Sequence, residues 1–277
     1  MSATNSQLNL VENEDEVQLR ELAEGFLKSR APGVHRGPVE GLWAELDEMG
    51  WSELPSEFGL TETAIAMEAL GFHLAHTPLL HKVLGGSLVE GGIAEVGERY
   101  IAAGCFVAEA NVEPVRRIDG RDCARVEVVA LGQPVPDFKE RLDQARIALA
   151  AEMLGGMRRA FAITLEYLKT RHQFGKPIGA NQALQHRAVD CFVQIELARS
   201  AVMAASRAPS PQRASLAKAI CSEAYLHVTK EGIQLHGGIG MTEEADIGLF
   251  LKRAGVCAQS MGTASFHRRR WAELNGY

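Results

Sequence analysis

A stripe of apolar residues at helical spacing crosses residues 147–168 and constrains the fold of this 277-residue chain more than any other feature. Its members advance by three or four positions and so share one face of a long α-helix: Ile147, Ala150, Leu154, Met157, Phe161, Leu165 and Leu168. A helix of this kind derives most of its stability from packing its apolar face on other elements. The stripe therefore predicts a bundle of helices.

Three more helices are predicted after this one. The second begins near Gln182 and ends before the sequence PSP at residues 209–211, and the fourth covers residues 247–257. The second helix is expected to bury Leu184, Ala188, Phe192, Ile195 and Val202, and the third to run through Leu216, Ile220 and Val228. Short connections between amphipathic helices predict an antiparallel four-helix bundle in a C-terminal domain of residues 138–277.

Residues 1–84 are predicted to form an N-terminal helical domain. Its clearest helix is expected to begin at Thr61 as N-cap and to end before Pro78, with Met67, Leu70 and Leu74 on one packed face. Residues 85–137 differ, because they contain two glycine pairs, short apolar pieces and an Asp119-Gly120 turn signal. The predicted fold is therefore mainly α, with a reduced β-containing middle segment between two helical domains.

Composition and motifs exclude several classes of function. The formal net charge of −6 argues against a nucleic-acid partner, and no apolar run of about 18 residues predicts a membrane span. The N-terminus lacks the features of a signal peptide, so a cytoplasmic location without a membrane partner is expected. The five scattered cysteines and the absence of a His-Glu-x-x-His sequence predict neither disulfides nor a metal site.

Two short segments could contact a phosphate-bearing ligand. Arg171 follows the first long helix and precedes Gly175 and Pro177, so its guanidinium either binds a pyrophosphate or simply faces water at the helix end. The pair Gly237-Gly238 either lets main-chain amides approach a ligand or caps the third helix. It is no Rossmann fingerprint, because a helical pattern precedes it.

Both segments resemble the flavin-binding region of the acyl-CoA dehydrogenase family. The sequence RHQFGKPI at residues 171–178, followed by Gln182, resembles one family motif, and QLHGGIG at residues 234–240 resembles another. The resemblance extends from about residue 151 to residue 264, with both motifs in the family's order and spacing. Residues 57–61 and 70–80 also resemble the N-terminal domain of the family.

The resemblance implies FAD as cofactor and a set of residues that hold it. Arg171 would bind the pyrophosphate, while Phe174 and Gln182 would line the adenosine half. The remaining residues would approach the ADP moiety or close on the cofactor: Gln234, Leu235, His236, Gly237, Gly238, Thr263, Ala264 and Ser265. In family dimers much of this cradle reaches across the subunit interface.

The resemblance also implies that the catalytic base is absent. Many family members carry a glutamate just before the final Gly-Thr, where this chain has Met261, and the alternative position falls at or near Ala145. A thioether cannot accept the substrate proton. No catalytic residue is therefore assigned, and the middle segment is shorter than the β-domain of the family.

The chain is thus expected to be the short subunit of a heteromeric acyl-CoA dehydrogenase, as in bacterial steroid degradation. A base-containing partner in an α2β2 assembly, an acyl-CoA substrate and an electron-transfer flavoprotein are the expected partners. Two alternatives stay open. The chain could be a structural subunit without cofactor, or a self-sufficient flavoenzyme whose base is Glu152 or Glu243.

Overall fold

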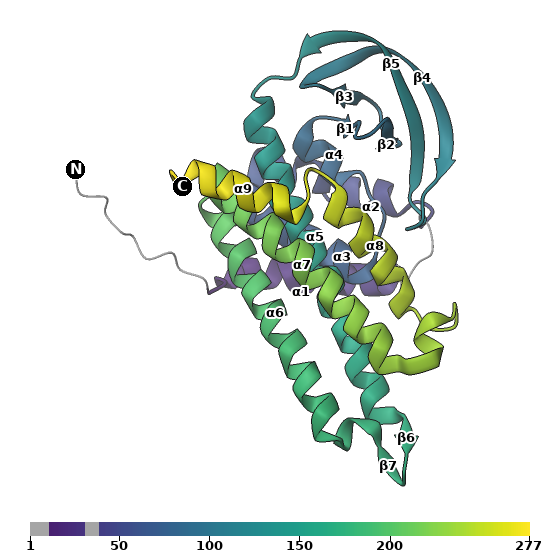
Figure 1. Ribbon diagram of the computed structural model, residues 1–277. Coiled ribbons are helices and arrows are strands. Elements are labelled where there is room, and N and C mark those ends of the chain that lie inside the picture. The colour runs from purple at the N-terminus through teal and green to yellow at the C-terminus, as the bar shows by residue number, and fades with distance from the viewer. Residues whose placement is uncertain (1–10, 31–38) are drawn as a thin grey trace, which may run out of the picture.

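The long helix α5 (Phe138–Thr170) lies at the centre of the computed structural model, which describes residues 11–30 and 39–277 (Figure 1). Four helices follow it in the chain: α6 (Gln182–Arg207), α7 (Pro211–His236), α8 (Ile247–Gln259) and α9 (Ala264–Leu274). Helices α5, α6, α7 and α8 form the predicted antiparallel bundle. Ser210 caps α7 by accepting a hydrogen bond from the Arg213 amide at 3.2 Å.

The bundle differs from the sequence-based prediction in two respects. Phe192 was expected in the core, but 51% of it is exposed, because it lies at the edge of the contact between α6 and α5, with its ring centroid 6.4 Å from that of Phe161. Helix α9 is not one of the four predicted bundle helices, although the run Arg268-Arg269-Arg270 was interpreted as a helix end. It packs on α7 through the buried His267.

The N-terminal helices cover one flank of α5. They are α1 (Glu14–Arg30), α2 (Leu42–Glu48), α3 (Leu60–His73) and α4 (Leu79–Leu84), with two short turns, η1 (Trp51–Glu53) and η2 (Leu54–Phe58). The predicted N-cap Thr61 is wrong, because α3 begins at Leu60 after Gly59, whose carbonyl accepts a hydrogen bond from the Thr63 hydroxyl.

Helices α3 and α5 cross so closely that both are buried on nearly every side. We predicted one packed face for each, yet all but one residue between Thr63 and His73 are buried, and so is the whole stretch Ala145–Met157. Glycines permit this crossing. A Cβ on Gly71 would lie 1.9 Å from the Glu152 carbonyl oxygen, and one on Gly155 would lie 1.8 Å from that of Glu68.

The middle segment contains a five-stranded sheet in the order β1-β3-β4-β5-β2. The strands are β1 (Ser87–Leu88), β2 (Ile93–Glu95), β3 (Tyr100–Ala102), β4 (Cys105–Arg116) and β5 (Asp122–Pro134). Strands β1 and β3 are parallel, and the other pairs are antiparallel. The predicted turn at Asp119-Gly120 joins the long hairpin β4–β5, with Gly120 in the left-handed region (φ 80°). The sheet lies beside α4 and the beginning of α5 (Figure 1).

Within residues 11–30 and 39–277, no helix combines the length and the hydrophobicity needed to cross a bilayer.

Candidate functional site

The first predicted ligand-binding segment forms the tip of the α5–α6 hairpin. Arg171 caps α5, and the short strands β6 (His172–Gln173) and β7 (Lys176–Pro177) and the turn η3 (Ile178–Ala180) lead into α6 (Figure 1). Arg171, Phe174 and Gln182 are all exposed, and Phe174 is 94% exposed with φ 55°. The Arg171 guanidinium has no hydrogen bond or ion pair within the described residues, so it is available to an anion.

The second segment packs directly on the first. The His236 ring stacks on Tyr167 with centroids 4.5 Å apart, and Leu235 joins Leu168 and Ala188 in a small apolar cluster. The Leu235 and His236 side chains are buried, so only their main chain can approach a ligand, whereas Gln234 is exposed. The structure therefore brings the two segments together at one end of the bundle.

The glycine pair leaves main chain open at this end. Gly237 and Gly238 are exposed, and a Cβ on either would meet no heavy atom within 4 Å. Gly237 adopts φ 66° and is also the C-cap of α7, so both of the roles considered for the pair are compatible. Exposed amides beside a free guanidinium fit the ADP half of FAD.

The third predicted segment lies elsewhere. Thr263 is the N-cap of α9, where its hydroxyl accepts a hydrogen bond from the Phe266 amide at 3.3 Å, and Ala264 and Ser265 begin that helix. Helix α8, with 13 residues, separates this turn from the end of α7 by roughly 20 Å. The third segment therefore lies at the opposite end of α8 from the other two.

The turn that carries Met261 is tightly fixed. Met261 is buried, with φ 59°, and its carbonyl oxygen accepts hydrogen bonds from Arg146 Nε at 3.2 Å and from His267 Nε2 at 3.0 Å. Burial and the nearby Arg146 lower the pKa of His267 to about 4, so the ring stays neutral. Buried Lys218 donates to the Gly262 carbonyl oxygen at 3.1 Å, and burial lowers its pKa to about 8.

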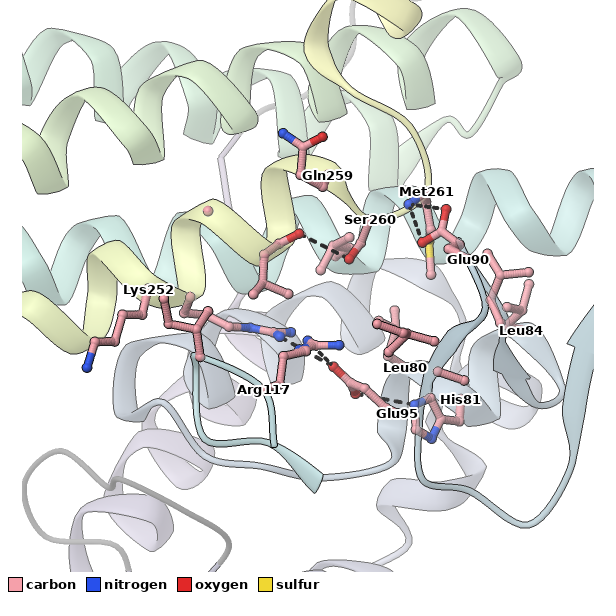
Figure 2. Close-up of a pocket in the computed structure, with 18 of the residues that line it drawn as sticks. Leu80, His81, Leu84, Glu90, Glu95, Arg117, Lys252, Gln259, Ser260 and Met261 are labelled. Carbon is pink, nitrogen blue, oxygen red and sulfur yellow. Dashed lines mark hydrogen bonds and ion pairs between the residues drawn. The ribbon is translucent and has the colours of Figure 1, made fainter. Parts of the chain in front are cut away.

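A carboxylate from the middle segment reaches the same turn. Both Glu90 oxygens accept the Met261 N–H, at 2.8 and 2.9 Å, and burial of the carboxylate raises the pKa of Glu90 (Figure 2). Sequence reasoning missed this residue, because Glu90 lies 171 positions before Met261 beside a glycine pair with no distinguishing pattern. No local signal could have identified it.

Glu90 and Met261 line a pocket of about 560 Å³ between the sheet, α4 and α8. Large aliphatic side chains form one part of its lining: Leu80, Leu84, Leu88, Ile93, Ile118, Leu149, Leu251 and Val256. An ion network forms another part of the wall, where Glu95 contacts Arg117 at 2.8 Å and His81 at 3.4 Å. Arginines hold the pKa of Glu95 well below its usual value against the opposing effect of burial.

The two alternative bases are poorly placed. Glu152 is buried and accepts hydrogen bonds from Arg253 at 2.8 and 3.1 Å and from Arg121 at 2.5 Å. Burial works to raise the pKa of Glu152, but the two arginines outweigh it and lower the pKa, so this carboxylate stays ionised and fully engaged. Glu243 is exposed in the loop before α8, at the opposite end of that helix from Met261.

Comparisons with known proteins agree with this architecture. A sequence model of the "Acyl-CoA dehydrogenase, C-terminal domain" matches residues 135–274. The acyl-CoA dehydrogenase IpdE2 of Mycolicibacterium smegmatis is 33% identical over 93% of this chain and 98% of its own length. IpdE2 of Mycobacterium tuberculosis is 35% identical over 81% of this chain and 83% of its own length.

Solved structures share the fold at low sequence identity. The Tcur3481-Tcur3483 steroid ACAD has a TM-score of 0.80 at 22% identity, covering 95% of this chain and 98% of that one. The ChsE4-ChsE5 complex of Mycobacterium tuberculosis has a TM-score of 0.78 at 18% identity, covering 97% and 99%. The helical arrangement, the matched C-terminal domain and the similarity to IpdE2 along most of the sequence show that this chain belongs to the acyl-CoA dehydrogenase family.

Proposed function

We propose that this chain is one subunit of an FAD-dependent acyl-CoA dehydrogenase that desaturates an acyl-CoA thioester between its α- and β-carbons. The observation that carries the proposal is the open surface formed by Arg171, Gln182, Gln234 and the Gly237-Gly238 main chain, together with a methionine at the usual position of the base. The chain is equipped to bind a nucleotide and lacks the residue that starts the reaction.

The chain's own residues would bind and orient the ADP half of FAD. Arg171 would pair with the pyrophosphate, Gln182 and Phe174 would line the adenosine half, and Gln234 with the main chain at Gly237 would approach the ADP moiety. FAD, when bound, accepts a hydride from the β-carbon of the substrate. The cradle segments on α7 and α9 lie at opposite ends of α8, so each would serve a different cofactor in a paired assembly.

The outer face of α6 supports pairing with a partner. Val189, Val193 and Leu197 recur every fourth residue and are 57%, 48% and 53% exposed. This stripe continues from Gln182, the first residue of α6, so a subunit that shares the cradle can also cover it. An unlike subunit in an α2β2 assembly is the partner we favour, because two of the structural neighbours are named for pairs of proteins.

The partner would also supply the proton acceptor. Met261 has no titratable group, Ala145 has none either, and Glu152 is held by two arginines. The α-proton then passes to a carboxylate of the partner, and electrons leave through an electron-transfer flavoprotein in the cytoplasm. A bulky acyl group such as a steroid side chain is the substrate class we favour, since one structural neighbour is named a steroid ACAD.

A structural subunit without cofactor remains the second candidate. Against it stands the exposed Arg171 guanidinium, because an arginine retained only for folding would bond to neighbouring carbonyls or carboxylates, as Arg213 does with the Ala208 carbonyl oxygen at 2.7 Å.

Co-purification with the unlike subunit tests the proposal. We expect the complex to be yellow and Arg171→Met to weaken FAD binding at least about tenfold, because a charge-assisted pyrophosphate contact is lost. Arg269→Met, which removes another exposed arginine on α9, should leave the affinity unchanged. A colourless complex, or full FAD affinity in Arg171→Met, would contradict the assignment.

Met261→Glu tests where the proton acceptor lies. If the partner supplies it, restoring a carboxylate in this chain should change turnover of the complex by less than about twofold, measured with an electron acceptor dye. A large gain in turnover would show that this chain frames an incomplete catalytic site of its own.

A further inference from the structure

The turn between α8 and α9 holds its main chain in a strained conformation. Met261 adopts φ 59° and Gly262 adopts φ 107°. A side chain as large as methionine is rare in the left-handed region, and such strain persists only where the surrounding structure enforces it. A Cβ on Gly262 would lie 2.6 Å from Phe266 Cδ1 and 2.9 Å from His267 Nε2, so the second position requires glycine.

One arm of contacts enforces this turn from α5 and α9. Arg146 donates from Nε to the Met261 carbonyl oxygen at 3.2 Å and from Nη1 to Asp143 Oδ1 at 2.8 Å. The Arg270 guanidinium donates to both oxygens of the same carboxylate, at 2.8 and 2.7 Å. Asp143 therefore joins two arginines, and Arg270 reaches the turn through Asp143 and Arg146.

A second arm closes a ring of hydrogen bonds through α7. Arg270 Nη1 also donates to Ser215 Oγ at 2.8 Å, and Ser215 Oγ lies 3.5 Å from His267 Nδ1. A pKa of about 4 keeps His267 neutral, and its Nε2–H donates to the Met261 carbonyl oxygen. Because a neutral imidazole has one donor and one acceptor, Nδ1 accepts and the Ser215 hydroxyl donates to it.

The ring is closed off from solvent on most sides. Ser215 and His267 are fully buried, Asp143 and Arg146 are 7% exposed, and the Arg270 side chain is 22% exposed. A buried donor or acceptor that loses its partner costs free energy, so the members hold one another in a single arrangement. Arg270 lies nearest to solvent and can be replaced with the least disturbance of the core.

The ring fixes the start of the third predicted cofactor segment. Thr263 follows the turn directly, and its hydroxyl oxygen accepts a hydrogen bond from the Phe266 amide. The amides of Ala264 and Ser265 have no acceptor within the described residues, as expected for the first turn of a helix. The direction of these free donors depends on the turn just before them.

We propose that Asp143 and Arg270 are positioning residues for this segment: they hold the Met261 carbonyl through Arg146 and so orient the free donors of residues 263–265 for the cofactor. Their role is to act through the turn, not to contact the cofactor. The inference rests on the proposed function, because it takes residues 263–265 as a cofactor contact. Both residues lie outside the motifs from which the cradle was predicted.

Arg270→Met tests this role in the complex with the unlike subunit. It removes the hydrogen bonds to Asp143 and Ser215 and keeps an unbranched aliphatic stem. We expect FAD affinity, measured by quenching of flavin fluorescence, to fall at least about fivefold, because part of the binding free energy is then spent on ordering the turn. Arg269→Met is the matched control, since the Arg269 side chain is 72% exposed and its one ion pair within the described residues is with Glu273, at 4.0 Å.

Two further readouts do not depend on FAD. Amide exchange at Phe266 and His267, whose N–H groups bond to Thr263, should quicken at least about fivefold in Arg270→Met without cofactor. Loss of the nearby positive charge should also raise the pKa of His267, measured by NMR titration of its ring. Arg270→Lys keeps the charge and one donor, so it should return this pKa toward its native value and restore part of the FAD affinity.

The outcomes separate this role from the proposed function. A native complex that binds no FAD would refute the proposed function and this inference with it. If the native complex binds FAD and Arg171→Met weakens that binding, full affinity in Arg270→Met would overturn the positioning role alone, and so would unchanged amide exchange. Should Arg270→Met fail to fold, Ser215→Ala decides, because it breaks the second arm by deleting one hydroxyl. Faster exchange with weaker FAD binding in Ser215→Ala supports the role, and native values of both overturn it.

Discussion

At the scale of single residues, His267 couples the Met261 turn to pH. Its ordinary pKa of 6.5 falls to about 4 in the folded chain, through burial and the positive charges of Arg146, Lys218 and Arg270. Between pH 6.5 and 4 the unfolded chain binds a proton that the folded chain does not, so the free energy of unfolding decreases as pH falls through this window, by up to about 3 kcal/mol. His267→Gln removes that contribution. We expect the variant to be less stable than the native chain at pH 7.5, with a gap that narrows toward pH 4.5 in urea unfolding; His227→Gln, at an exposed site, is the control. A gap that is constant with pH would refute the coupling.

At the scale of elements, the crossing of α3 and α5 depends on glycine. A methyl group at position 155 would lie 1.8 Å from the Glu68 carbonyl oxygen, and this main-chain atom cannot move aside as a side chain could. We expect Gly155→Ala to lower the free energy of unfolding by about 1–3 kcal/mol, even though alanine favours a helix over glycine. Gly248→Ala has open space around its Cβ and should be neutral or stabilising. Thermal unfolding of the two variants distinguishes them, and equal midpoints would show that the helices can separate without cost.

At the scale of the whole molecule, the exposed stripe on α6 predicts how the chain assembles. A charge in the middle of an apolar contact is left without a partner, so Val193→Asp should weaken association with the unlike subunit at least about tenfold while the chain keeps its helical content. Val96→Asp alters another valine that is about half exposed, between β2 and β3, and serves as the control. Analytical ultracentrifugation measures both. Normal assembly of Val193→Asp would place the interface elsewhere. The domain boundaries at residues 84/85 and 137/138 stay predictions, because α3 and α5 share one core.

The amino-acid sequence by itself determined the long helices α5 to α8 and the β-containing connector, because these depend on periodicity and turn residues. The cofactor segments stay predictions, drawn from contiguous motifs. The sequence placed the beginning of α6 at Gln182 and the end of the third helix at Gly237 correctly. It failed where burial depends on neighbours. Phe192 belongs to an apolar pattern yet is half exposed at the edge of the contact with α5, since a pattern does not say how fully a neighbouring helix covers each of its members.

Only the tertiary structure decided which distant residues meet. It placed the Arg171 and Gly237 segments side by side, left Thr263 at the far end of α8, and set the Glu90 carboxylate against the Met261 amide across 171 positions of sequence. The physical reason is that a side-chain contact of this range depends on how the sheet and α8 pack on α4 and α5. That packing is a property of the assembled core, and no local pattern around Glu90 or Met261 encodes it.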